Sequence, residues 1–97
     1  MEIRERFEQY EDEFMEFGRI KDPPHLRPDV CAFIVLDRLV PPPFPKREMV
    51  CAAEHDEIYL DVDPAKLTEV ASDDDIKLLV RCGVRYDEST DSLAMFV

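Results

Sequence analysis

Glycine is nearly absent from this sequence, because Gly18 and Gly83 are the only two among its 97 residues. Phosphate-binding loops need several closely spaced glycines, so neither the dinucleotide fingerprint nor the triphosphate loop can be built here. Basic patches interleaved with aromatic residues, which are typical of nucleic-acid readers, are missing as well. The sequence therefore excludes the nucleotide enzymes that carry those motifs and favours no direct contact with nucleic acid.

Cysteine is scarce and its number is odd. Cys31, Cys51 and Cys82 lie 20 and 31 residues apart, a spacing that matches neither a disulfide framework nor a paired-cysteine motif. We therefore expect all three to be buried, reduced thiols.

Long apolar runs and targeting signals are also missing. The longest wholly apolar run covers the seven residues 30–36, whereas a membrane-spanning helix needs about 20. The first seventeen residues carry seven acidic side chains, the opposite of the basic start of a signal peptide. We predict a cytoplasmic protein that does not bind membranes.

Positive charge is in short supply, with 12 basic residues against 23 acidic ones and a net charge of −11. Such a chain is repelled by the phosphates of nucleic acids and by anionic membranes. Residues 54–63 alone carry five carboxylates and no lysine or arginine. We expect the partner to be a basic protein surface, although the acidity can also serve only to keep a small domain soluble.

An apolar stripe predicts an N-terminal amphipathic helix over residues 2–17. Its members recur at steps of four and three, the spacing of one helix face: Ile3, Phe7, Tyr10, Phe14 and Phe17. The other faces are almost entirely acidic, and Gly18 follows where a left-handed C-cap is expected.

Two proline-rich connectors flank the apolar run 30–36. Because proline and the residue before it avoid helix, segment 23–28 predicts an extended connector. The run itself is too apolar for a strand with one wet face, so we interpret it as a central strand covered on both faces. Prolines fill the following loop, 41–45, except at Phe44, which is either a lid on the core or an exposed anchor for a partner.

Two hairpins are expected in the second half of the chain. Residues 49–53 and 58–62 form the first, turning through His55 and Asp56, because apolar and polar side chains alternate along 58–62. Residues 84–86 and 93–97 form the second, around the polar turn 87–91.

Two short helices are expected between the hairpins. Asp63 can cap the first, with Pro64 at its first position. Ser72 and Asp75 form a variant of the capping box that opens the second, which runs to Cys82 and is ended by Gly83. Its inward residues are Ile76, Leu79 and Val80.

These elements predict a single compact α+β domain over residues 1–97. An N-terminal amphipathic helix precedes a four- or five-stranded, mainly antiparallel sheet with two further short helices, in the order α-β-β-β-α-α-β-β. Because the chain closes on a strand, that strand is expected to offer an exposed edge through which two copies can form a homodimer.

Metal binding and catalysis have little support. Cys51 and His55, with Cys82 and His25, contain the atoms of a zinc site, but positions four apart on a strand are separated by about 13 Å. The aspartates at 61, 63 and 73–75 suit a divalent cation, yet most are explained as helix caps. His55 beside two carboxylates suits acid–base chemistry, as do many surface loops. We expect no cofactor, no metal and no catalytic residue.

The leading hypothesis is a small protein-binding or regulatory module that works through an acidic interface. The expected interface residues are carboxylates of the first helix and the first hairpin, with two aromatic anchors: Glu8, Glu11, Asp12, Phe44, Glu54, Asp56, Glu57, Tyr59 and Asp61. One alternative is an inhibitor that mimics nucleic acid and occupies the site of a basic DNA- or RNA-binding protein. Another is a minor enzyme or metal-binding domain.

Overall fold

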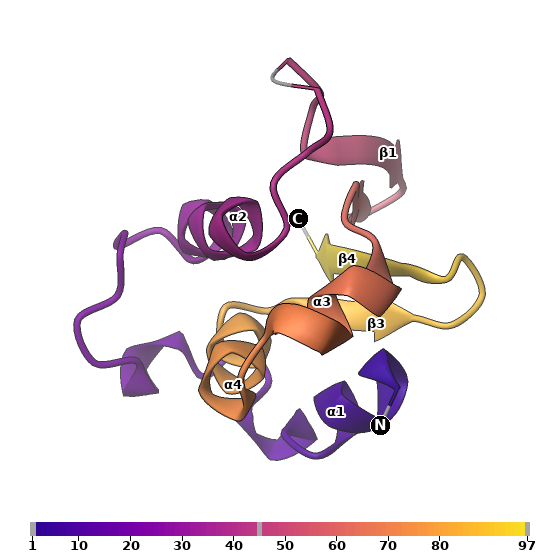
Figure 1. Cartoon of the computed structure of the whole chain (residues 1–97). Coiled ribbons are helices and arrows are strands. Elements are labelled where there is room, and N and C mark those ends of the chain that lie inside the picture. The colour runs from indigo at the N-terminus through magenta and orange to yellow at the C-terminus, as the bar shows by residue number, and fades with distance from the viewer. Residues whose placement is uncertain (1, 45, 97) are drawn as a thin grey trace.

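The structure is a computed structural model that describes residues 2–44 and 46–96. Within these residues a four-stranded antiparallel sheet has the order β1-β2-β4-β3 (Figure 1). Its strands are β1 (Val50–Glu54), β2 (Glu57–Leu60), β3 (Arg85–Asp87) and β4 (Ser92–Phe96). The helices are α1 (Ile3–Glu8), α2 (Pro28–Leu39), α3 (Pro64–Val70) and α4 (Asp73–Arg81), with short 3-10 helices η1 (Glu11–Glu13) and η2 (Phe17–Arg19). The expected α+β class is confirmed, while Pro45 and Val97 lie outside the described residues.

Both expected hairpins are confirmed, and pairing of β2 with β4 joins them into one sheet. His55 takes a left-handed φ of 54° in the turn of the first hairpin. β4 lies between β2 and β3, so the expectation that the closing strand forms an exposed edge was wrong. The edges of the sheet are β1 and β3.

The apolar run 30–36 is helical, and its interpretation as a central strand was wrong. Pro28 stands at the start of α2, where its fixed φ suits a helix and its missing N–H is not needed. Asp29 in the first turn and Arg38 in the last complement the helix dipole. The buried residues of α2 follow helical spacing: Cys31, Ala32, Val35 and Leu36. A short apolar run without a period is compatible with both structures, and the proline start decides for helix.

The N-terminal helix is shorter than predicted, since α1 ends at Glu8 and the chain continues through η1 and η2. Acidic side chains are favourable only in the first turn of a helix, so the carboxylates further along do not support its continuation. Met15 lies in the left-handed region, with φ 63°, which no continuous helix permits. The expected helix 2–17 was therefore wrong beyond Glu8, and Gly18 lies within η2 rather than at a left-handed cap.

The start signals of α3 and α4 are confirmed. The Asp63 side chain accepts a hydrogen bond from the Ala65 N–H at 2.9 Å. Ser72 and Asp75 form the reciprocal capping box, with bonds of 3.1 and 2.9 Å. Gly83 follows α4 with φ +97°, a conformation that favours glycine.

The core lies between the helices and one face of the sheet. In Figure 1, α3 lies in front of the strands. Leucines from α2, α3, α4 and β4 are fully buried. Cys31 and Cys82 are buried as expected, whereas Cys51 lies exposed on β1, so that part of the prediction was wrong. None of the described helices is long and apolar enough to cross a bilayer.

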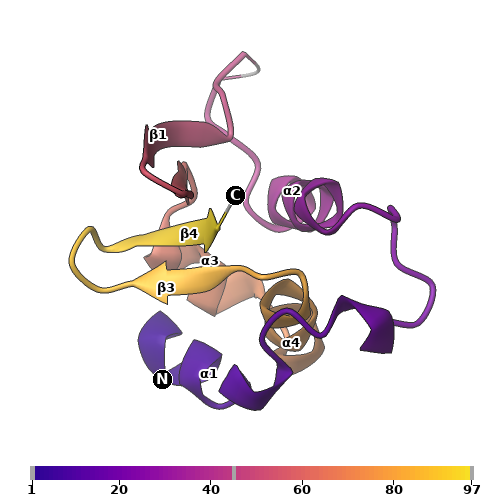
Figure 2. The ribbon, with the colours of Figure 1, turned by 180° about the vertical axis from the view of Figure 1, so that it is seen from behind.

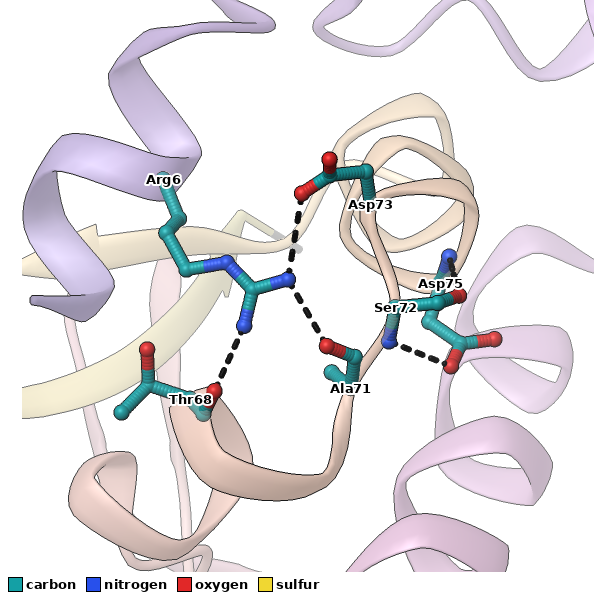
Figure 3. Close-up of polar contacts among 6 residues, drawn as sticks. All are labelled: Arg6, Thr68, Ala71, Ser72, Asp73 and Asp75. Atoms are coloured by element: carbon teal, nitrogen blue, oxygen red, sulfur yellow. Dashed lines mark hydrogen bonds and ion pairs between the residues drawn. The ribbon is translucent and has the colours of Figure 1, made fainter. Parts of the chain in front are cut away.

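Arg6 joins three helices (Figure 3). It is only 9% exposed, although the sequence places it among surface carboxylates. Its guanidinium donates to the carbonyl oxygens of Thr68 and Ala71, both at 2.7 Å, and lies 3.3 Å from Asp73. The last carbonyls of a helix have no partner within it, so Arg6 satisfies the end of α3 and holds α1 against it.

Candidate functional site: the open face of the sheet

One face of the sheet carries no helix among the elements described. Viewed from behind, β3 and β4 stand in front of α3 (Figure 2). The strand register places two rows of side chains on this face: Glu54, Glu57 and Phe96 in one row, and Ala52, Tyr59, Ala94 and Arg85 in the next. Alternate residues such as Leu60, Leu93 and Met95 point the other way and are buried in the core. We call the seven residues of the two rows the open face.

Arg85 organises the centre of the open face. Its guanidinium carbon lies 4.7 Å from the centroid of the Phe96 ring, and its terminal nitrogen pairs with Glu57. The Tyr59 hydroxyl in turn donates to Glu57 at 3.3 Å. Ala94, at 0% exposure, is covered by these longer side chains. The central charges therefore neutralise each other, and the aromatic rings are held in place.

Next to the centre, the face is apolar and exposed. Phe96 is 52% exposed, and the Phe14 ring meets it edge-on at a centroid distance of 6.4 Å. Met15 is 63% exposed. It lines, with Phe96 and the start of α2, a hollow of about 320 Å³ at the end of the sheet, whose floor includes Ile58 and Met95 from the inner face. Phe96 and Met15 thus form an exposed apolar patch beside the open face, in a strongly acidic protein.

Glu13 anchors the segment that brings Phe14 and Met15 to this patch. Its carboxylate accepts hydrogen bonds from Arg81 at 3.0 Å and from Arg19 at 3.1 Å. The hydrogen bond from Arg81 is the largest cause that lowers the pKa of Glu13 below its ordinary value, followed by Arg19. The carboxylate thus stays ionised at neutral pH, and the segment remains tied to α4.

The rim of the open face at the first hairpin is acidic. Glu54 and Asp56 are exposed, and neither forms an ion pair with a lysine or arginine in the part of the chain that is described. Glu54 lies 3.8 Å from Nε2 of His55, a contact that carries charge only when the histidine is protonated. These two carboxylates are therefore available to a partner, whereas Glu57 is occupied by Arg85.

The structure brings only some of the predicted interface residues together. Glu54, Glu57 and Tyr59 share the open face, and Asp56 lies in the adjoining turn. The others lie elsewhere: Glu8, Glu11 and Asp12 belong to α1 and η1, Phe44 is 67% exposed in the proline loop, and Asp61 pairs with Arg47. Since α1 contacts β3, the carboxylates of α1 lie at the sheet edge opposite β1, three strand spacings or about 14 Å across.

Sequence reasoning missed Arg85 and Phe96 as members of the open face, and Met15 as their exposed neighbour. Phe96 alternates with the buried Met95 and Leu93, so the period of two already places it on the outer side of a strand. The contact of Arg85 with Phe96 and Glu57 depends on the pairing of β2 with β4, which no local pattern specifies.

Cys82 is a buried thiol of the core. Burial, with the neighbouring Cys31 thiol, raises the pKa of Cys82 far above its usual range, so this thiol is a poor nucleophile and metal ligand. Across the described residues, no group of three or more histidine, cysteine, aspartate or glutamate side chains is placed to hold a metal ion. Comparisons with protein-family models, with curated proteins and with solved structures found no match.

Proposed function

We propose that this chain is a protein-binding module whose open face docks on a basic surface of another protein. The observation that carries the proposal is a sheet face without a helix among the described elements. On it the exposed Phe96 and the half-buried Tyr59 stand near the exposed carboxylates of Glu54 and Asp56. Aromatic side chains held in place are the usual anchors of interface energy. Carboxylates at the rim supply steering and selectivity for cations.

The chemistry of the face suits arginine and lysine side chains. Within the chain itself, the Arg85 guanidinium already lies over an aromatic ring and against a carboxylate. A partner's cation would meet the same two kinds of group, aromatic and acidic, at Tyr59 and Glu54. The net charge of −11 attracts such a partner over a longer range.

The test is capture of partners from a native lysate by the wild type and by two variants of equal charge. The face variant is Glu54→Gln with Asp56→Asn, which leaves Glu57 and Asp61 in their ion pairs. The control is Glu69→Gln with Asp74→Asn, two exposed carboxylates on α3 and α4. We expect a basic protein to be retained by the wild type and the control, and to bind the face variant about fivefold more weakly, since each rim charge contributes up to about 1 kcal/mol.

Two results would count against the proposal. Equal losses in both variants would show that net charge alone matters, and an unchanged face variant would place the interface elsewhere. Release of the captured protein by duplex DNA would instead favour mimicry of nucleic acid.

A further inference from the structure

The edge strand β1 carries mostly small, exposed side chains. Four of its five residues are exposed, and three of those four have small side chains: Cys51, Ala52 and Ala53. Small side chains leave the backbone accessible from both sides of the sheet. The opposite edge differs, because α1 contacts β3. Of the two edges, β1 is therefore the one open to another strand.

Natural edge strands are usually blocked by proline, by lysine, by a bulge or by a covering element. β1 contains neither proline nor lysine. A shift of register between Val50 and Ala52 interrupts the ladder at Cys51, but the stretch Ala52–Glu54 pairs regularly with β2. The outer side of that stretch has backbone N–H and C=O groups that a further strand can use.

Ala53 is the residue whose backbone faces outward. The hairpin turns through two residues, His55 and Asp56, so Glu54 and Glu57 form the pair that exchanges hydrogen bonds next to the turn. Pairs alternate in an antiparallel ladder, which leaves Ala53 and Ile58 as a pair without mutual bonds. The N–H and C=O of Ala53 therefore point away from β2.

We propose that an extended, cationic segment of the partner protein pairs with β1 and adds a fifth strand to the sheet. This inference rests on the proposed function and names the form in which the basic partner binds. Charge decides between a foreign segment and a second copy of this chain: a second copy carries the same net charge of −11 and is repelled, whereas a cationic segment is attracted to Glu54 and Asp56 beside this edge. A lysine or arginine at alternate positions meets Glu54 on the open-face side while the main chain bonds to Ala53.

The test uses a short peptide of alternating lysine and valine and follows amide hydrogen exchange by NMR. We expect saturating peptide to slow exchange of the Ala53 amide at least about tenfold, because that amide becomes hydrogen-bonded. Ala53→Pro removes this donor and is expected to weaken binding about fivefold to tenfold. Ala53→Val keeps the donor and serves as the matched control, with unchanged affinity.

The outcomes separate this inference from the proposed function. If the peptide shifts the amide signals of Tyr59 and Phe96 while Ala53 exchanges as before, the open face binds and pairing at β1 is overturned. If the peptide neither binds nor protects any amide, pairing is overturned and the capture experiment alone decides on the open face. Dimerisation of the wild type with protection of Ala53 would make a second copy the occupant and overturn the proposal. Should Ala53→Pro fail to fold, exchange in the wild type still decides.

Discussion

Replacing Arg6 by methionine is expected to lower the free energy of unfolding by about 3 kcal/mol. The substitution keeps an apolar stem of similar length but leaves the carbonyl oxygens of Thr68 and Ala71 without their charged donor. A hydrogen bond to a charged group contributes about 1.5–3 kcal/mol, and an unsatisfied buried acceptor carries a desolvation cost. The Asp73 side chain, 73% exposed, adds little to the difference. Urea denaturation followed by circular dichroism measures the change.

Arg4 provides the matched control on the same helix. Its ion pairs with Glu8 and Glu88 are exposed to solvent, so Arg4→Met is expected to cost less than about 1 kcal/mol. Arg6→Lys, with a single terminal amine, is expected to fall between the two. Equal losses for Arg4→Met and Arg6→Met would contradict the role of Arg6 as the link between α1 and the end of α3.

Replacing Leu36 by alanine is expected to cost about 2–5 kcal/mol, the range for a buried leucine that leaves a cavity. Leu36 is fully buried on the inner side of α2, whereas Ile34 is only partly buried. Ile34→Ala is therefore expected to cost clearly less than Leu36→Ala. Thermal and urea denaturation of the two variants, compared with the wild type, measure the difference.

This pair of variants also distinguishes a helix from a strand at residues 30–36. A central strand covered on both faces would bury both residues equally and give equal losses. A larger loss for Leu36→Ala agrees with α2. Similar losses would contradict the helical burial pattern of this segment.

Local signals in the sequence were sufficient to predict the helices and strands in the second half of the chain. The alternation along 58–62 predicts β2, and the caps at Asp63 and Ser72 predict the starts of α3 and α4. Each of these signals acts over a few residues and needs no information about the rest of the chain.

Where tertiary structure decides, the sequence was ambiguous or misleading. The apolar run 30–36 shows neither the period of a helix nor that of a strand. The helical spacing that begins with Ile3 and Phe7 continues along the sequence beyond Glu8, where α1 ends. Arg6 resembles a surface cation until α3 supplies the carbonyls that hold it. In the same way Tyr59 was identified as an anchor, but its neighbours Phe96 and Arg85 come from strands that only the sheet pairing brings close.

Photo-cross-linking from the open face tests the central claim most directly. The probe is Phe96→p-benzoylphenylalanine, and the control is Val70→p-benzoylphenylalanine on α3, since the two native side chains are 52% and 53% exposed. We predict that irradiation in a native lysate joins a basic protein to position 96 and not to position 70. Cross-linking of the same protein from both positions, or none from position 96, would contradict the assignment of the open face as the interface.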